Sequence, residues 1–217
     1  MKKKIRSFLK KFVWLERYCP FSNRLRLRSA TISYGKKRFK NNTVDCRGSG
    51  NQIILLGEGT VDHCRFFIRG NGNTILIGSG SSAVNGEFWI EDDRNTISIG
   101  EGTNLTGKIQ LACIEGRKIE IGNNCLFSSE VVLRTGDSHS ILNAEGERIN
   151  PSQDIQIADR VWVGHRVAIQ KGVKIQPDTV IGANAVVTKS VEQSNVIVAG
   201  CPARVIKENV SWDSRRL

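Results

Sequence analysis

The chain has 217 residues, a length that suits one domain or at most two. Its formal net charge of +11 favours an anionic partner, such as a phosphorylated coenzyme, an anionic glycan, a membrane surface or nucleic acid. Nucleic acid is disfavoured, because the sequence holds no known base-reading module and only 14 aromatic residues (4 Trp, 2 Tyr and 8 Phe). No apolar run reaches the roughly eighteen residues that a bilayer-spanning helix needs.

The first segment, residues 1–20, is expected to form an amphipathic helix. Ile5, Phe8, Leu9 and Phe12 share one face, and lysines occupy the rest of the surface. Such a helix either caps the end of a repeat domain or lies on an anionic membrane. We favour the cap and assign residues 1–40 to an N-terminal helix and cap, while peripheral membrane contact through residues 1–20 stays open.

From about Asn41 the chain repeats with a period of 21 to 22 residues. An aliphatic residue followed by glycine marks each repeat, at Gly57, Gly78, Gly100 and Gly122. A bare three-sided coil needs 18 residues, so each early coil carries three or four more, which we place in a corner loop. An asparagine precedes the apolar strand of three successive repeats and is predicted to form a hydrogen-bonded corner ladder: Asn51, Asn73 and Asn95.

The regular spacing of aliphatic residues stops between Leu133 and Ile155. Residues 134–154 are polar, contain Gly and Pro, and are too many for a simple corner. We predict one protruding loop here, since long loops on rigid scaffolds often carry function.

Strict hexads follow the loop, from Ile157 to Glu192. Each of six consecutive blocks of six opens with Ile or Val, and the fifth position is small or β-branched. This period fits neither a helix nor a simple strand, but it fits a solenoid with three short strands to a coil. The first-position side chains should point inward and stack on the residue eighteen further along. We therefore predict an all-β solenoid over residues 41–200, with residues 201–217 as a tail that ends in a short helix or arm.

The six cysteines form no C-x-x-C pair and lack the density of a small secreted disulfide framework. We expect reduced thiols in a cytoplasmic protein.

Several motifs in order resemble the hexapeptide-repeat, or left-handed parallel β-helix, acyltransferases over about residues 50–208. They are the hexads, Asp137-Ser138-His139 in the loop, Val161-Trp162-Val163-Gly164, Val187-Thr188-Lys189 and Ala199-Gly200-Cys201-Pro202-Ala203-Arg204. Within the family the chain looks most like the maltose, galactoside and capsular-polysaccharide O-acetyltransferases, although Cys201 stands where they usually have Asn. The resemblance implies a left-handed helix and a homotrimer with active sites between subunits. It also implies acetyl-CoA as co-substrate and a carbohydrate acceptor, the hydroxyl of a sugar or of a capsule, O-antigen or similar glycan.

Acetyl transfer to a hydroxyl needs a base, because the hydroxyl loses its proton as the C–O bond forms. Of the three histidines, His139 lies in the loop and matches the family's catalytic position, whereas His63 and His165 are expected to be structural or peripheral. Asp137 either orients the imidazole or caps the loop turn, and the sequence leaves both roles open. A backbone N–H near Gly164 is the candidate donor to the oxyanion.

The predicted coenzyme-binding residues lie in the last coils. Trp162 should face outward, either as a platform for a sugar ring or the pantetheine arm or as a packing residue at the trimer interface. We favour the platform, because by resemblance this Trp lies in the active-site cleft. By resemblance, Ala183 and Thr188 contact the pantetheine, while Lys189 and Arg204 approach the nucleotide phosphates. Gly164 completes this set.

Two other functions stay open: an amino-sugar N-acetyltransferase on the same fold, and a non-catalytic trimeric glycan-binding scaffold. Carbonic anhydrases on this scaffold need three His around zinc. Here His63 and His139 are 76 residues apart, about four coils, so we expect no metal site.

Overall fold

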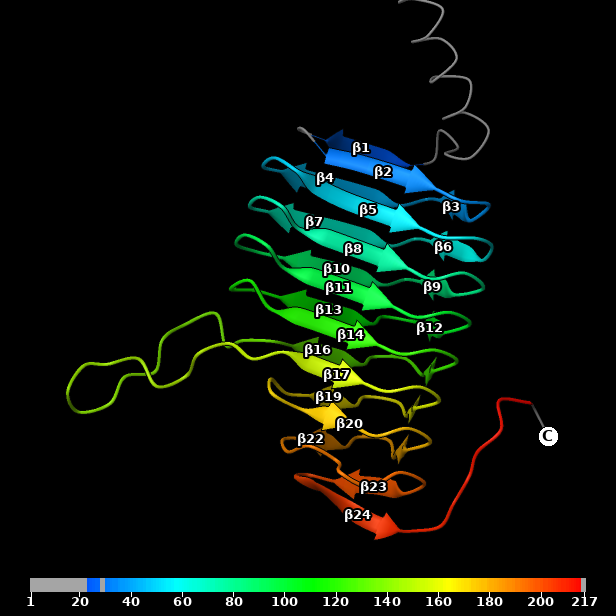
Figure 1. Cartoon of the computed structure of the whole chain (residues 1–217), viewed down its shortest axis with the longest axis vertical. Coiled ribbons are helices and arrows are strands. Elements are labelled where there is room, and N and C mark those ends of the chain that lie inside the picture. Colours follow the sequence, from blue (N-terminus) through cyan, green and yellow to red (C-terminus); the bar gives the residue numbers. More distant parts are fainter. Residues whose placement is uncertain (1–22, 28–29, 216–217) are drawn as a thin grey trace, which may run out of the picture.

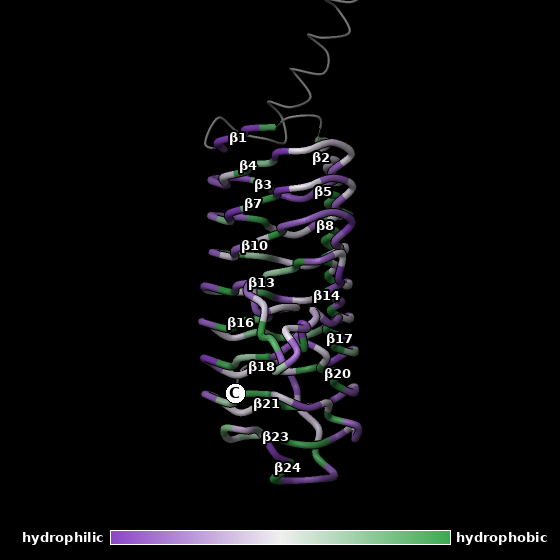
Figure 2. Tube along the Cα trace, turned by 90° about the vertical axis from the view of Figure 1, so that its left-hand side faces the viewer, coloured by the Kyte–Doolittle hydropathy of each residue, from purple (hydrophilic) through white to green (hydrophobic). Residues whose placement is uncertain are grey.

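The computed structural model describes residues 23–27 and 30–215. These residues form a parallel β-helix whose coils stack along one axis (Figure 1). Three sheets make the three sides of the coil, and apolar stretches recur in coil after coil (Figure 2). The predicted amphipathic helix of residues 1–20 lies outside the described residues.

The strands of each sheet come from successive coils. The first sheet contains, in order, β1 (Arg24–Leu27), β4 (Thr43–Arg47), β7 (Arg65–Arg69), β10 (Glu87–Ile90), β13 (Gln110–Cys113), β16 (Val132–Arg134), β19 (Ala168–Ile169) and β22 (Val186–Val187). The second sheet contains β2 (Ala30–Tyr34), β5 (Asn51–Leu55), β8 (Thr74–Ile77), β11 (Thr96–Ile99), β14 (Lys118–Ile121), β17 (Ile155–Ile157) and β20 (Lys174–Ile175). The third sheet contains β3 (Arg38–Lys40), β6 (Thr60–Asp62), β9 (Ser82–Val84), β12 (Asn104–Thr106), β15 (Leu126–Phe127), β18 (Trp162–Val163), β21 (Val180–Ile181), β23 (Ile197–Gly200) and β24 (Ala203–Lys207).

The hexads form the core as predicted. Their first and fifth positions are all buried, none more than 7% exposed: Ile157, Val163, Ile169, Ile175, Ile181 and Val187, with Val161, Val167, Val173, Thr179, Ala185 and Val191. Parallel pairing sets each first-position side chain beside the one eighteen residues on, as for Val163 and Ile181. Two inward side chains on each short side fill the triangular interior, and this geometry explains the period of six.

The extra residues of the early coils lengthen the strands, so the predicted corner loop is wrong. β7, β8 and β9 have 5, 4 and 3 residues, whereas β18, β19 and β20 have 2 each. The connection between β7 and β8 (70–73) is as short as that between β18 and β19 (164–167). On the longer first side, Cys64, Phe66 and Ile68 all point inward, so the early coils enclose a wider core.

The solenoid also begins before residue 41. β1, β2 and β3 already pair in parallel with β4, β5 and β6, so residues 24–27 and 30–40 belong to the first coil and not to a separate cap. The repeat signal is present there as Tyr34-Gly35, 22 residues before Gly57, but a tyrosine stands in the aliphatic position. A Cβ on Gly35 would lie 2.6 Å from the Gly57 nitrogen, so glycine is needed where these two coils approach.

The asparagine ladder is confirmed. The Asn73 N–H donates to Asn51 Oδ1 at 2.9 Å, and the Asn95 N–H donates to Asn73 Oδ1 at 2.8 Å. All three side chains are buried, and Asn95 Oδ1 continues the ladder by accepting the Arg117 N–H. Each buried Oδ1 therefore accepts an N–H group of the next coil, which stabilises this corner.

The C-terminal tail forms an arm rather than a helix. β24 pairs antiparallel with β23, and residues 208–215 then run back alongside the last coils without regular structure (Figure 1). The Val210 N–H donates to the Asn195 carbonyl, and the Asn195 side chain donates to the Val210 carbonyl. These bonds hold the arm against the solenoid.

Candidate active site

The predicted loop leaves the solenoid between β16 and β17 and projects far from it (Figure 1). Both ends of the loop are fixed where they join the solenoid. Thr135 is buried, its hydroxyl accepts the Ile114 N–H at 3.0 Å, and its carbonyl accepts the Gln153 N–H at 2.8 Å. A Cβ on Gly136 would lie 2.1 Å from Ser152 Oγ, so only glycine fits here. The loop therefore starts from a rigid neck.

Asn150 organises the backbone around His139. Its carboxamide is nearly buried and donates to the His139 carbonyl and to Asp137 Oδ2, both at 2.8 Å. Its Oδ1 accepts the Ile141 N–H at 2.7 Å. Sequence reasoning missed this residue, although an Asn before a Pro is a turn signal. Asn150 positions the backbone on both sides of the candidate base.

The imidazole of His139 is exposed, so it is accessible to a substrate or to a neighbouring molecule. Ser138, just before it, has a left-handed φ of 63°, which turns the chain at this point. His139 as the general base remains a prediction.

Asp137 is held by two neighbours. Lys171 Nζ and the Asn150 carboxamide both donate to its Oδ2. The Lys171 ammonium, and then the Asn150 amide, lower the pKa of this carboxyl below its usual range, so Asp137 is anionic at neutral pH. Its predicted role in orienting His139 remains a prediction, and the contacts seen here tie it to Asn150 and Lys171.

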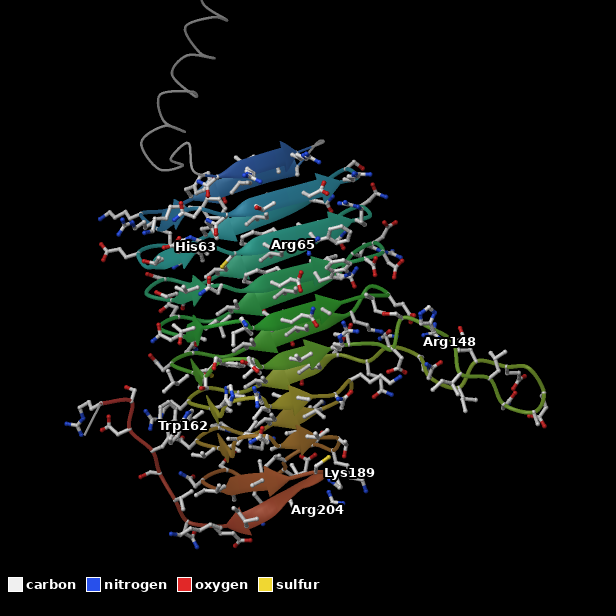
Figure 3. All side chains as sticks on the ribbon, turned by 180° about the vertical axis from the view of Figure 1, so that it is seen from behind. His63, Arg65, Arg148, Trp162, Lys189 and Arg204 are labelled. Carbon is white, nitrogen blue, oxygen red and sulfur yellow. The ribbon has the colours of Figure 1, made fainter. Side chains whose placement is uncertain are left out.

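Lys189 and Arg204 come together, as the coenzyme hypothesis requires. Both line an open groove of about 480 Å³ at the C-terminal end of the solenoid, with Val187, Ser190 and Val205. Figure 3 shows the two cationic side chains close to each other. Thr188 lies next to Lys189, in the corner that follows β22. We call this open groove the basic groove, because its two cations outnumber the one acidic residue of the lining, Glu192, and are suited to phosphate groups.

Trp162 lies on a different part of the solenoid surface from the basic groove. It belongs to β18, is 40% exposed and points outward as predicted. In Figure 3 it lies at the opposite edge of the solenoid from Lys189 and from Arg148 of the loop. Within one chain, therefore, Trp162 and the loop that carries His139 are not brought together.

Gly164 and Ala183 lie in two stacked corners between the third and first sheets. A Cβ on Gly164 would lie 2.8 Å from the Ala183 nitrogen, so glycine permits the close approach of these coils. The Gly164 N–H donates to the Ile181 carbonyl at 2.8 Å. This N–H is therefore engaged in the coil and is unavailable as an oxyanion donor.

The other histidines have polar partners outside the loop. His63 is exposed, with Nδ1 2.8 Å from the Asp62 carboxylate. His165 Nδ1 lies 2.9 Å from Ser129 Oγ and 3.0 Å from the Ser129 carbonyl. Among residues 23–27 and 30–215, no three His, Cys, Asp or Glu side chains gather in a metal-binding group.

The buried cysteines do not supply a nucleophile. Cys46, Cys64, Cys113 and Cys125 are free and buried. Burial raises the pKa of Cys64 and Cys125 to about 11 and that of Cys113 to about 12. These thiols are protonated near neutral pH and hence poorly nucleophilic.

One aromatic contact was not foreseen. Trp212 of the C-terminal arm lies beside Trp162, with ring centroids 6.0 Å apart. Nothing in the sequence pattern places the two rings together.

No helix in the described part of the chain is long and apolar enough to cross a membrane.

Comparison with known proteins agrees with the fold. The family model of the bacterial transferase hexapeptide (six repeats) matches residues 154–189. Among solved structures, the polySia-specific acetyltransferase NeuO is 31% identical, with 86% of each chain covered and a TM-score of 0.74. The polysialic acid O-acetyltransferase OatWY is 27% identical over 91% of this chain and 90% of the other, with a TM-score of 0.54.

Curated relatives match over shorter stretches. The polysialic acid O-acetyltransferase of Escherichia coli O1:K1 is 38% identical over 95 residues, which cover 43% of this chain and 31% of that protein. The galactoside O-acetyltransferase of Escherichia coli K12 is 38% identical over 107 residues, 48% of this chain and 51% of the relative. The chain thus spans about a third to a half of the length of these relatives. The hexads and the structural match over 86% of both chains together show that the chain belongs to the hexapeptide-repeat acyltransferases and shares their left-handed parallel β-helix.

Proposed function

We propose that this protein is an acetyl-CoA-dependent O-acetyltransferase that acts on a sugar or polysaccharide hydroxyl. The observation that carries the proposal is the likeness to a polysialic-acid-specific acetyltransferase over 86% of both chains. The net charge of +11 favours an anionic glycan among the acceptors, because opposite charge raises the encounter rate.

In the proposed reaction, an imidazole nitrogen of His139 takes the proton of the acceptor hydroxyl. The hydroxyl oxygen attacks the thioester carbonyl, and the tetrahedral intermediate collapses as the C–S bond breaks. The imidazolium returns its proton to the departing thiolate, so the products are the acetyl ester and free coenzyme A. Neutral His139 is regenerated, and no metal takes part.

The predicted site residues outside the loop are assigned to the donor. Lys189 and Arg204 face its phosphates across the basic groove, while Ala183 and Thr188 contact the pantetheine. Trp162 provides an aromatic platform, and Gly164 permits the close approach of the coils beside it. Asp137 helps to hold the loop that presents His139.

We further propose a homotrimer, because one chain holds the His139 loop and Trp162 at opposite edges (Figure 3). A second chain would bring its loop to the Trp162 of the first. We also propose a cytoplasmic location, in keeping with reduced thiols. Residues 1–20 are proposed to cap the first coil or to touch a membrane surface.

The test follows thiol release from acetyl-CoA in the presence of short polysialic acid oligomers and a panel of neutral glycans. We expect His139→Ala to lower kcat by roughly 10²- to 10⁴-fold, the usual contribution of a positioned general base. His63→Ala is the matched control and should keep full activity, because its side chain lies in an early coil. If the wild type releases thiol no faster than buffer alone with every acceptor, the protein is a non-catalytic scaffold and the proposal fails. Equal rates in the wild type and His139→Ala, both above that background, would remove His139 as the base.

A further inference from the structure

An apolar stripe runs along the outer face of the third sheet, where solvent-facing side chains are usually polar. Four outward side chains follow one another in register on β15, β18, β21 and β23: Leu126, Trp162, Val180 and Ile197. None of the four is buried, and Trp162 is the most exposed. We call these four residues the outer stripe.

The C-terminal arm adds a second aromatic ring to the outer stripe. Trp212 Nε1 donates to the Arg160 carbonyl at 2.7 Å, and Arg160 donates back to the Trp212 carbonyl at 3.1 Å. This reciprocal pair fixes the indole beside Trp162, with an angle of 44° between the ring planes. Since Trp212 lies outside the solenoid core, the fold does not need an aromatic residue at this position.

The surroundings of the two rings favour an uncharged ligand. The Arg160 guanidinium lies 5.5 Å from the Trp212 ring centroid, but its Nε donates to Asp178 at 2.7 Å. The carboxylate offsets this cationic charge, so a phosphate or an anionic sugar gains little here. The cations suited to phosphate, Lys189 and Arg204, lie in the basic groove at the opposite edge of the same chain, so in the proposed trimer the groove of a neighbouring chain would face these rings.

The length and position of the stripe suit the pantetheine arm of an acyl donor. Four adjacent strands span three spacings of about 4.8 Å, or about 14 Å. Pantetheine is an uncharged chain with two amide bonds, about as long as four extended residues at 3.3–3.6 Å each. The stripe also crosses β21, which leads directly to Ala183, a predicted pantetheine contact.

We propose that Trp212 and Trp162 form an aromatic wall, continuous with the outer stripe, against which the pantetheine arm of the acyl donor packs. The C-terminal arm is then part of the donor site, and Trp212 is a donor-binding residue. This inference rests on the proposed function, because it requires coenzyme A as the ligand.

The test measures binding to the full chain by calorimetry, with no acceptor present. The probes are coenzyme A and adenosine 3′,5′-bisphosphate, which has the nucleotide end but no pantetheine arm. Trp212→Ala should weaken coenzyme A binding roughly five- to tenfold, the contribution of one aromatic contact, and leave the nucleotide unaffected. Trp212→Phe should keep most of the affinity.

Two control variants are measured beside Trp212→Ala. Ser214→Ala, on the same arm and exposed, should change neither affinity. Lys189→Ala should weaken both probes, since it removes a cation near the phosphates. Thermal unfolding and sedimentation of Trp212→Ala should match the wild type, and a changed oligomeric state would instead mark Trp212 as a subunit contact.

The outcomes separate the two proposals. The aromatic wall is refuted if the wild type and Trp212→Ala bind coenzyme A equally well. It is also refuted if Trp212→Ala loses as much affinity for the nucleotide as for coenzyme A. In both cases the proposed function stands. If Trp212→Ala alters only the KM of the acceptor, the rings bind the sugar and the inference is again refuted. If the wild type binds no coenzyme A, both proposals fail.

Discussion

At the residue scale, Lys37 combines full burial with a positive charge. Its ammonium donates to the carbonyls of Glu58, Gly78 and Ser81 at 2.6–3.0 Å. These acceptors belong to later coils, so the side chain ties the first coil to its successors. Burial lowers the pKa of Lys37 to about 8 from its ordinary value of 10.5, because the charged form loses its hydration.

This lowered pKa predicts how stability depends on pH. Between pH 8 and 10.5 the unfolded chain keeps the Lys37 proton while the folded chain has lost it. The unfolded state then binds more protons, so stability rises with pH, by up to about 1.4 kcal/mol per pH unit. This contribution of Lys37 to the free energy of unfolding is complete above pH 10.5 and is lost as pH falls through 8.

Urea unfolding of the wild type and of Lys37→Met from pH 7 to 10.5 checks this prediction. The difference in unfolding free energy, wild type minus variant, should rise across the window because methionine does not titrate. A difference that stays level with pH would contradict a lowered pKa for Lys37.

Residue-scale expectations from the sequence were most reliable where backbone geometry alone decided them. The asparagine ladder followed from a recurring Asn before each strand, because parallel coils place equivalent residues in contact. Asn150 was missed, since its role depends on the path of an irregular loop that no period describes. The contact of Trp212 with Trp162 was missed for the same reason, as it joins residues 50 positions apart through an arm without regular secondary structure.

At the scale of elements, the loop between β16 and β17 depends on its neck. Asn150→Ala would remove the bonds to Asp137, to the His139 carbonyl and to the Ile141 N–H. We expect kcat to fall roughly ten- to a hundredfold because the base is no longer held in position. The KM for acetyl-CoA should stay unchanged, since the basic groove lies elsewhere.

Steady-state kinetics of Asn150→Ala against Asn143→Ala test this positioning role. Asn143 lies at the loop tip, and its side-chain Oδ1 accepts the Glu145 and Glu147 N–H groups within that tip. Its variant should keep nearly full activity. An equal loss in both variants would mean that the neck has no special part in catalysis.

The elements also show which parts of the fold a period predicts. A strict period of six residues places two inward side chains on each side of the coil, so the sequence predicted the structure of the late coils. In the early coils the same 22-residue period fits either longer strands or a larger corner. Only packing decided between them, because Cys64, Phe66 and Ile68 all find room inside the wider coil.

At the scale of the whole molecule, the placement of His139 and Trp162 predicts a site shared between chains. His139→Ala should be nearly inactive alone, and Trp162→Ala should lose most of its activity at acetyl-CoA concentrations below KM. In trimers co-expressed from equal amounts of both, a shared site is intact when one variant supplies the loop and the other supplies the tryptophan. Random assembly then restores about a quarter of wild-type activity.

The measurement is thiol release by the purified mixed trimers, with separately purified variants mixed without subunit exchange as the control. Recovery near a quarter supports sites between subunits. No recovery in the mixed trimers would mean that each chain carries a complete site, against the separation seen in Figure 3.

The sequence by itself determined the solenoid, its three-sided coils, the position of the loop and the inward stacking of the hexads. It could do so because each of these depends on contacts between equivalent positions of neighbouring coils, which a fixed period encodes. Only the tertiary structure decided where the coils begin, how the Asn150 neck holds the loop, and that Trp212 reaches Trp162. Those features depend on contacts between non-equivalent residues of irregular segments, and no local pattern records such contacts.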